Sequence, residues 1–261
     1  MTRLFGIERC ALVGMVHLQP LPGSPGWDGA MSDVLSRARS DAETLLEGGC
    51  DALLVENMGD LPFLRGRVEP ETVAAAAIAT REVVKLGAPT GVAMLAGANR
   101  EALGIAVAAG ASFIRVEAYA YAHVADEGWL DACAGELLRV RRALGVGVKV
   151  WADVRKKHAA HSVTADLSLA ELARGHAFCG ADALVVTGPA TGEPTAIEDV
   201  EAAREAGLPV IVGSGVTAAT ARQFAARSEA LVVGSWLKEE GDWRRPVDPA
   251  RVRALRAVLT S

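Results

Sequence analysis

Short runs of apolar residues alternate along this chain with longer amphipathic segments rich in alanine. A short apolar run is typical of a strand buried on both faces, and apolar residues three or four positions apart are typical of a helix. The runs predict eight strands, at residues 11–17, 52–56, 91–95, 113–117, 148–154, 183–187, 209–212 and 230–233. The other segments predict helices at residues 31–47, 70–85, 100–109, 129–144, 167–179, 196–206, 217–226 and 248–259. Strands and helices that alternate throughout predict a parallel sheet, and eight such units predict a closed (β/α)₈ barrel, the TIM barrel.

A glycine phrase recurs just before predicted strands, as in Gly49-Cys50-Asp51-Ala52 and Gly180-Ala181-Asp182-Ala183. Glycine ends a helix in left-handed geometry, so the phrase has a structural explanation and indicates a repeated βα unit. The chain has 261 residues, close to the roughly 250 residues of one barrel. No low-complexity linker interrupts the series. We therefore expect one domain over residues 1–261.

The composition restricts what the protein can bind. The formal net charge is −5, so the chain lacks the basic footprint of a nucleic-acid-binding protein, and we expect no nucleic-acid partner. Its four cysteines are scattered without Cys-x-x-Cys spacing, which favours reduced core residues in a cytoplasmic protein. No stretch approaches the ~18 continuous apolar residues of a membrane span, so we expect no integral membrane contact.

Two glycine-serine turns follow the last two predicted strands: Gly213-Ser214-Gly215 and Gly234-Ser235. Turns at these two places form the phosphate-binding site of many (β/α)₈ barrels, because glycine lets backbone N–H groups close on an anion. Val216 and Thr217 are predicted to start a short helix whose first N–H groups add to this site. Thr187 and Gly188, after the sixth predicted strand, can form a third wall. The alternative is that these turns are plain βα loops without a ligand.

Polar residues end several of the predicted strands. His17 ends the first, Glu56 and Asn57 the second, and Asp153 lies near the end of the fifth. In a barrel these ends meet at one mouth, where catalytic residues lie. Glu56 and Asp153 can move a proton, bind a hydroxyl group or hold a divalent cation, and Asn57 can contact a ligand. His17 can polarise a carbonyl or shuttle a proton; alternatively, it bonds a neighbouring backbone group.

Alternation along two neighbouring strands brings more charges to one face. Arg115 shares a face with Glu117, and Lys149 shares a face with Asp153. One interpretation is a neutral ion network that fixes packing inside the barrel. The other is that Lys149 is desolvated, which lowers its pKa and makes it a base or a Schiff-base amine.

His158 and His161 are three residues apart, as two metal ligands on one helical face are. The segment follows a strand as a loop and lacks the glutamate of a zincin helix, so we assign no metal site and no required cofactor. Lys156 and Lys157 in the same loop are expected to attract a phosphorylated ligand electrostatically.

Several sequence segments together resemble those of a known protein family. They are the segment from Val13 to Pro25 with its His-Leu-Gln-Pro-Leu-Pro-Gly-Ser-Pro sequence, Val55 to Asp60, Ala152-Asp153 before Lys157-His158, and Gly213 to Thr217. Through them nearly the whole chain resembles the BtpA/SgcQ family. The resemblance implies a barrel of the ribulose-phosphate-binding type. It also implies two branches of function, one tied to photosystem I biogenesis at thylakoid membranes and one found among sugar-utilisation proteins.

Two classes of function follow. The first is an enzyme acting on a phosphorylated small molecule, a sugar phosphate or a nucleotide, by isomerase, aldolase-like lyase or hydrolase chemistry. The alternative is a non-catalytic assembly factor of the BtpA type. Polar groups at so many strand ends favour the enzyme, because a scaffold has no need of them. Trp129, Trp236 and Trp243 are expected to be exposed and to favour a homo-oligomer.

Overall fold

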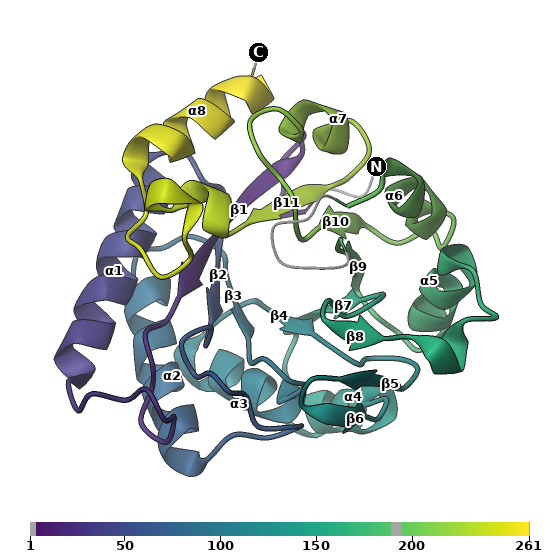
Figure 1. Cartoon of the computed structure of the whole chain (residues 1–261), viewed down its shortest axis with the longest axis horizontal. Coiled ribbons are helices and arrows are strands. Elements are labelled where there is room, and N and C mark those ends of the chain that lie inside the picture. Colours follow the sequence, from purple (N-terminus) through teal and green to yellow (C-terminus); the bar gives the residue numbers. More distant parts are fainter. Residues whose placement is uncertain (1–3, 189–194, 261) are drawn as a thin grey trace.

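The computed structural model describes residues 4–188 and 195–260, in which eight parallel strands close into a barrel surrounded by helices (Figure 1). The strands are paired in the order β1, β2, β3, β4, β7, β9, β10, β11, and β11 pairs back with β1. Their bounds are β1 Ala11–His17, β2 Ala52–Glu56, β3 Thr90–Ala93, β4 Phe113–Val116, β7 Lys149–Asp153, β9 Ala183–Val186, β10 Val210–Val212 and β11 Ala230–Val233. The predicted (β/α)₈ fold is confirmed.

The helices follow the strands and cover the outside of the barrel. They are α1 Met31–Glu47, α2 Pro70–Val84, α3 Asn99–Ala109, α4 Ala134–Ala143, α5 Leu169–Phe178, α6 Ile197–Arg204, α7 Ala221–Ala225 and α8 Pro249–Thr260, with short 3₁₀ turns at Ser162–Thr164, Ser235–Leu237 and Glu239–Gly241. Local sequence explains some of these boundaries. Pro70 opens α2 at a position where its missing N–H is not needed, and Ser168 forms a capping box with Glu171 at the start of α5.

Two predicted helices are wrong in part. The segment predicted as a helix from 129 to 144 begins with strand β6, Gly128–Leu130, and α4 starts only at Ala134. β6 pairs with β5, His123–Ala125, which also pairs with β8, Ala159–Ala160, in a small antiparallel sheet. The predicted helix 217–226 is reduced to the five residues of α7, because Thr217 and Thr220 close a turn on each other through their hydroxyl groups.

The barrel interior is filled by apolar side chains from alternate positions of the strands. Phe113 and Trp151 stack with ring centroids 3.8 Å apart, and Phe5 from the N-terminal segment packs against both rings. Gly91 makes room for this stack, because a Cβ there would overlap the Phe113 ring. A second apolar layer separates the strands from the helices. The base of the interior is therefore a packed core, and polar side chains are confined to the other end.

Strand register decides which side chains meet at that end. His17 and Glu56 are direct partners in the pairing of β1 with β2, so their side chains point to the same side at the same height. Ala93 on β3 is paired with both Glu56 and Arg115. Three strands thus bring His17, Glu56 and Arg115 into one layer at the mouth. Among the helices of the described residues, none is both long and apolar enough to cross a membrane.

Candidate functional site

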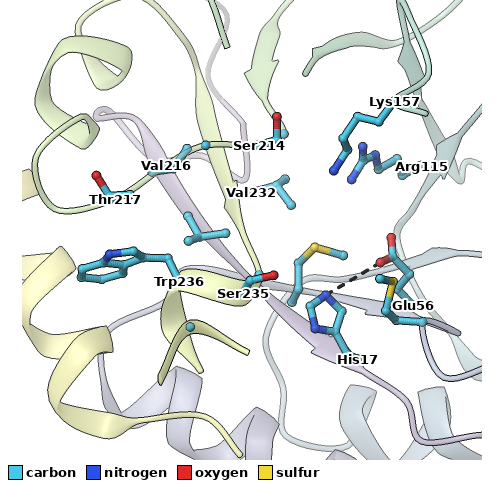
Figure 2. Close-up of a pocket in the computed structure, with 17 residues that line it drawn as sticks. His17, Glu56, Arg115, Lys157, Ser214, Val216, Thr217, Val232, Ser235 and Trp236 are labelled. Atoms are coloured by element: carbon cyan, nitrogen blue, oxygen red, sulfur yellow. Dashed lines mark ion pairs between the residues drawn. The ribbon is translucent and has the colours of Figure 1, made fainter. Parts of the chain in front are cut away.

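A cavity of about 220 Å³ opens at the carboxyl end of the barrel strands. Both glycine-serine turns form one wall, and charged or titratable side chains form the opposite wall (Figure 2). The lining residues are Met15, His17, Glu56, Met58, Arg115, Lys157, Gly213, Ser214, Gly215, Val216, Thr217, Val232, Val233, Gly234, Ser235, Trp236 and Gly241. The cavity therefore combines five of the predicted phosphate-binding residues with two of the predicted catalytic residues.

Backbone N–H groups are available along the wall of the turns. Gly215 has a φ of +69°, a left-handed conformation that favours glycine and curls the backbone. Within the described residues, the N–H groups of Gly215 and Val216 donate to no acceptor, and the same holds for Ser235 and Trp236. Successive unpaired N–H groups in a tight turn form a concave site for an anion. The predicted helix dipole contributes nothing here, since α7 begins only at Ala221.

The two turns also lie close to the opposite wall. A Cβ on Gly234 would be 2.9 Å from Cε1 of His17, and one on Gly213 would be 3.5 Å from Nη2 of Arg115. Glycine is needed at position 234 because any larger residue must displace the imidazole. A ligand that touches both turns is thereby brought next to His17 and Arg115.

His17 and Glu56 approach each other to 3.8 Å between Nε2 and Oε1, marked by the dashed line in Figure 2. Burial, together with the charges of Lys238 and Lys157, lowers the pKa of His17 well below its ordinary value. Burial raises the pKa of Glu56, although Arg115 and Lys157 act in the opposite direction. At neutral pH the pair is a neutral imidazole beside a carboxyl group that holds a proton more tightly than usual. Such a pair can accept and donate protons at the mouth.

Arg115 is held by Asp153 through two hydrogen bonds. Nε donates to Oδ1 at 2.9 Å and Nη2 donates to Oδ2 at 3.0 Å, and both side chains are buried. A planar guanidinium in such a bidentate pair has a fixed orientation. Asp153, predicted as a proton carrier or hydroxyl ligand, has both oxygens engaged and does not line the cavity.

Four further charged residues lie near this pair: Lys156, Lys157, Glu117 and Glu127. Lys156 forms ion pairs with Glu127 at 2.6 Å and with Glu117 at 3.7 Å, and burial raises the pKa of Glu117 to about 7. Lys157, the next residue, lines the cavity instead. Burial lowers the pKa of Lys157, as does the neighbouring Arg115, while Glu56 acts to raise it.

Lys149 does not belong to this site, and its predicted position inside the barrel is wrong. It is the first residue of β7, at the end of the strand remote from the mouth. Its side chain is 64% exposed and pairs with Asp182 at 3.2 Å. Alternation gives Lys149 the same face as Trp151, but Lys149 is the first residue of the strand, and there its flexible side chain reaches solvent.

Other predicted ligand-binding groups have partners within the protein. Asn57 donates to Asp60 and accepts from the N–H of Leu95, which ties the loop after β2 to the end of β3. Thr187 donates to the carbonyl of Arg155, and the N–H of Gly188 donates to the Ser214 hydroxyl at 2.6 Å. None of the three lines the cavity between the turns. They support its walls.

The histidine pair after β7 has no metal-ligand geometry in the described residues. His161 Nε2 bonds the carbonyl of Lys156 at 2.9 Å, and His158 has a left-handed backbone with a φ of +53°. No group of three or more His, Cys, Asp and Glu side chains within the described residues is arranged to hold a metal ion.

Arg115 and Lys157 are the cavity residues whose roles were missed. The sequence placed Arg115 in a structural ion network and gave Lys157 only a long-range electrostatic role. Alternation from Glu117 identifies the face of Arg115. No local pattern identifies Lys157, because its position depends on the pairing of β8 with β5.

Comparisons with known proteins agree with this architecture. A family model described as BtpA family matches residues 8–260. An uncharacterized mitochondrial protein of Caenorhabditis elegans is 39% identical over 259 residues, which cover 96% of this chain and 93% of that protein. The photosystem I biogenesis protein BtpA of Synechocystis sp. is 38% identical over 249 residues, 93% of this chain and 85% of that protein. A solved structure of 3-hexulose-6-phosphate synthase is similar in fold, with a TM-score of 0.59, 19% identity and coverage of 95% of this chain and 99% of that one. The chain belongs to the BtpA family.

Proposed function

We propose that this protein is an enzyme that binds a phosphorylated small molecule, a sugar phosphate or a nucleotide, at the mouth of the barrel. One observation carries the proposal: two turns with unpaired backbone N–H groups share a cavity with His17, Glu56, Arg115 and Lys157. Backbone N–H groups at the last two strands suit a phosphate. The opposite wall suits the rest of the ligand.

The roles in this proposal follow from the geometry. The phosphate is held by Gly215, Ser235 and their neighbours, and Arg115 supplies a positive charge whose direction is fixed by Asp153. Glu56 and His17 move protons on the ligand. Isomerase, aldolase-like lyase and hydrolase reactions all use such groups. The 3-hexulose-6-phosphate synthase fold neighbour supports a phosphorylated ligand only by analogy of fold.

A non-catalytic role in assembly is the second candidate. The relative named as a photosystem I biogenesis protein favours it. In that case the cavity would be a remnant or a regulatory site, and loss of its polar groups would leave the function intact. The buried charges at the mouth favour the enzyme, because such groups are expensive to bury without a use.

Ligand-dependent thermal stabilisation tests the proposal. Inorganic phosphate, sugar phosphates and nucleotides are screened, and at least one should raise the midpoint of unfolding. Gly215→Glu puts a carboxylate where the anion is expected, and Ser214→Trp fills the cavity, so both should abolish the shift. Gly147→Glu is the matched control, since Gly147 is exposed before β7 and a Cβ there meets nothing within 4 Å. An intact fold that responds to no phosphorylated compound contradicts the proposal.

Cytoplasmic location and homo-oligomer formation stay predictions. All four cysteines are free. Trp129 is 43% exposed, while Trp236 and Trp243 are partly buried. The most exposed large apolar side chain among the described residues is instead Phe178 at the end of α5, which is 93% exposed. Light scattering of the purified protein measures the oligomeric state directly.

A further inference from the structure

Lys157 differs from every other lysine of the chain in its surroundings. The chain has five lysines. Four of them are paired with carboxylates: Lys85 with Glu82, Lys149 with Asp182, Lys156 with Glu127 and Lys238 with Asp41. No hydrogen bond or ion pair within 4.0 Å is formed by the Lys157 amine with the described residues. It is also the lysine that lines the cavity between the turns.

The loop that carries Lys157 is held at both ends. It leaves β7 at Asp153, whose carboxylate binds Arg115, and it enters β8, which pairs with β5. Lys156 is fixed to Glu127 on the connection between β5 and β6. Figure 2 shows the Lys157 amine and the Arg115 guanidinium pointing into the cavity. Because its neighbours are fixed, the Lys157 side chain is directed to the cavity rather than to solvent.

An amine in this position has the properties of a nucleophile. Burial and the adjacent Arg115 lower the pKa of Lys157, so more of it is unprotonated at neutral pH. No carboxylate of the described residues binds its nitrogen within 4.0 Å, so the lone pair is open to a ligand. Glu56 lies near enough to act on the Lys157 charge and holds a proton more tightly than usual. The cavity thus provides a nucleophilic nitrogen and a proton carrier together.

We propose that Lys157 forms a covalent imine with a phosphorylated aldehyde or ketone bound in the cavity. This rests on the proposed phosphate site, which orients the carbonyl. The lone pair of Nζ attacks the carbonyl carbon, a C–N bond forms, and the π electrons move to the oxygen. The oxygen takes a proton from the Glu56 carboxyl group, and the nitrogen returns one to the resulting Glu56 carboxylate, which gives a neutral carbinolamine. Glu56 then gives its proton to the carbinolamine hydroxyl, which leaves as water while the nitrogen lone pair forms the C=N bond. One carbonyl group, one neutral amine and the proton of Glu56 become one protonated imine, one water and the Glu56 carboxylate.

An imine at Lys157 also explains how the other polar side chains of the cavity could take part in a reaction. A protonated imine withdraws electrons from the adjacent carbon, which makes a C–H or C–C bond there easier to break. His17, neutral at neutral pH, can then take the proton released from the adjacent carbon or hydroxyl group. The substrate class is therefore a phosphorylated carbonyl compound rather than a nucleotide.

Reductive trapping tests the inference on the intact protein. Glyceraldehyde 3-phosphate is the probe, and cyanoborohydride donates hydride to the imine carbon to leave a stable secondary amine. Peptide mapping by mass spectrometry should find the adduct at Lys157 in at least roughly tenfold excess over each other lysine. Glyceraldehyde without phosphate should label Lys157 roughly tenfold less, since each tenfold corresponds to about 1.4 kcal/mol of lost binding. Excess inorganic phosphate should suppress the adduct.

Two variants distinguish imine formation at Lys157 from the effect of the positive charge of Lys157 on ligand binding. Lys157→Arg keeps the positive charge and should keep the thermal stabilisation by the probe while it loses the adduct. Lys149→Arg is the matched control, remote from the cavity, and should label at Lys157 as the wild type does. The mapping of the wild type needs neither variant, so a variant that fails to fold leaves the test intact.

The outcomes distinguish this inference from the proposed function. If the probe stabilises the protein but the adduct is absent from Lys157 or spread evenly over the lysines, the imine is wrong and the phosphate site stands. If no phosphorylated compound stabilises the protein and no adduct forms, both are wrong.

Discussion

Asp153 accepts two hydrogen bonds from Arg115, at 2.9 Å from Nε and 3.0 Å from Nη2, in a part of the barrel mouth where their side chains are only 2% and 7% exposed. The pair joins adjacent strands β4 and β7. Because both carboxylate oxygens are occupied, we expect Asp153 to position the guanidinium rather than to transfer a proton.

Asp153→Asn should destabilise the protein strongly. It leaves the Arg115 charge buried without its counter-charge, and breaking a buried pair in this way costs about 3–5 kcal/mol. Equilibrium unfolding in denaturant measures the loss. Glu205→Gln is the control, because Glu205 pairs with Arg174 on the surface, where such a pair contributes about 0–1 kcal/mol. Equal effects of the two substitutions would show that the Arg115–Asp153 pair has no special structural role.

Glu117→Gln should stabilise the protein in a pH-dependent way. Burial raises the pKa of Glu117 to about 7 from 4.5, so the folded wild type keeps a proton that the unfolded chain releases. Below pH 4.5 the two proteins should be similarly stable. As pH rises to about 7 the wild type should lose up to about 3 kcal/mol relative to the variant. Lys156 keeps Glu127 as partner in the variant. Unfolding free energies compared from pH 4 to 8 measure the difference, and a difference that does not change with pH contradicts the raised pKa.

Gly234→Ala should displace the His17 ring. The new Cβ would lie 2.9 Å from Cε1 and 3.0 Å from Nε2 of His17, so the ring must move and its approach to Glu56 is disturbed. We expect turnover of any substrate to fall by at least about tenfold, which is 1.4 kcal/mol in the barrier. Proton NMR of the His17 ring checks the displacement without a substrate.

Gly104→Ala provides the control for that experiment. Gly104 lies in α3, and a Cβ there meets nothing within 4 Å. This variant should leave the His17 signals unchanged and gain about 0.5–1 kcal/mol of stability, because alanine loses less backbone entropy in a helix. If Gly234→Ala also leaves the His17 signals unchanged, the close approach of the second turn to His17 is wrong.

The barrel could be predicted from the sequence because each strand and helix carries its own local pattern. His17 and Glu56 could be predicted at the mouth because each ends its strand, and the pairing of β1 with β2 places them opposite each other. The position of a side chain along the barrel axis cannot be read from a local sequence pattern. Alternation assigns Lys149 to the inward face, but Lys149 is the first residue of β7 and its side chain reaches solvent. The place of Lys157 in the cavity could not be predicted for the same reason, because it depends on the pairing of β8 with β5, which lie far apart in the sequence. The hairpin of β5 and β6 was missed because Trp129, which pairs with Val124 across it, fits an apolar helix position equally well.

The proposed enzyme requires that the two turns hold a phosphate opposite His17 and Glu56. A crystal structure of the protein grown with inorganic phosphate tests it most directly. We predict a phosphate whose oxygens accept hydrogen bonds from backbone N–H groups of the first turn, at Gly215 or Val216, and of the second, at Ser235 or Trp236. A phosphate bound elsewhere on the barrel, with both turns bonded only within the protein, would contradict a phosphate site at the turns.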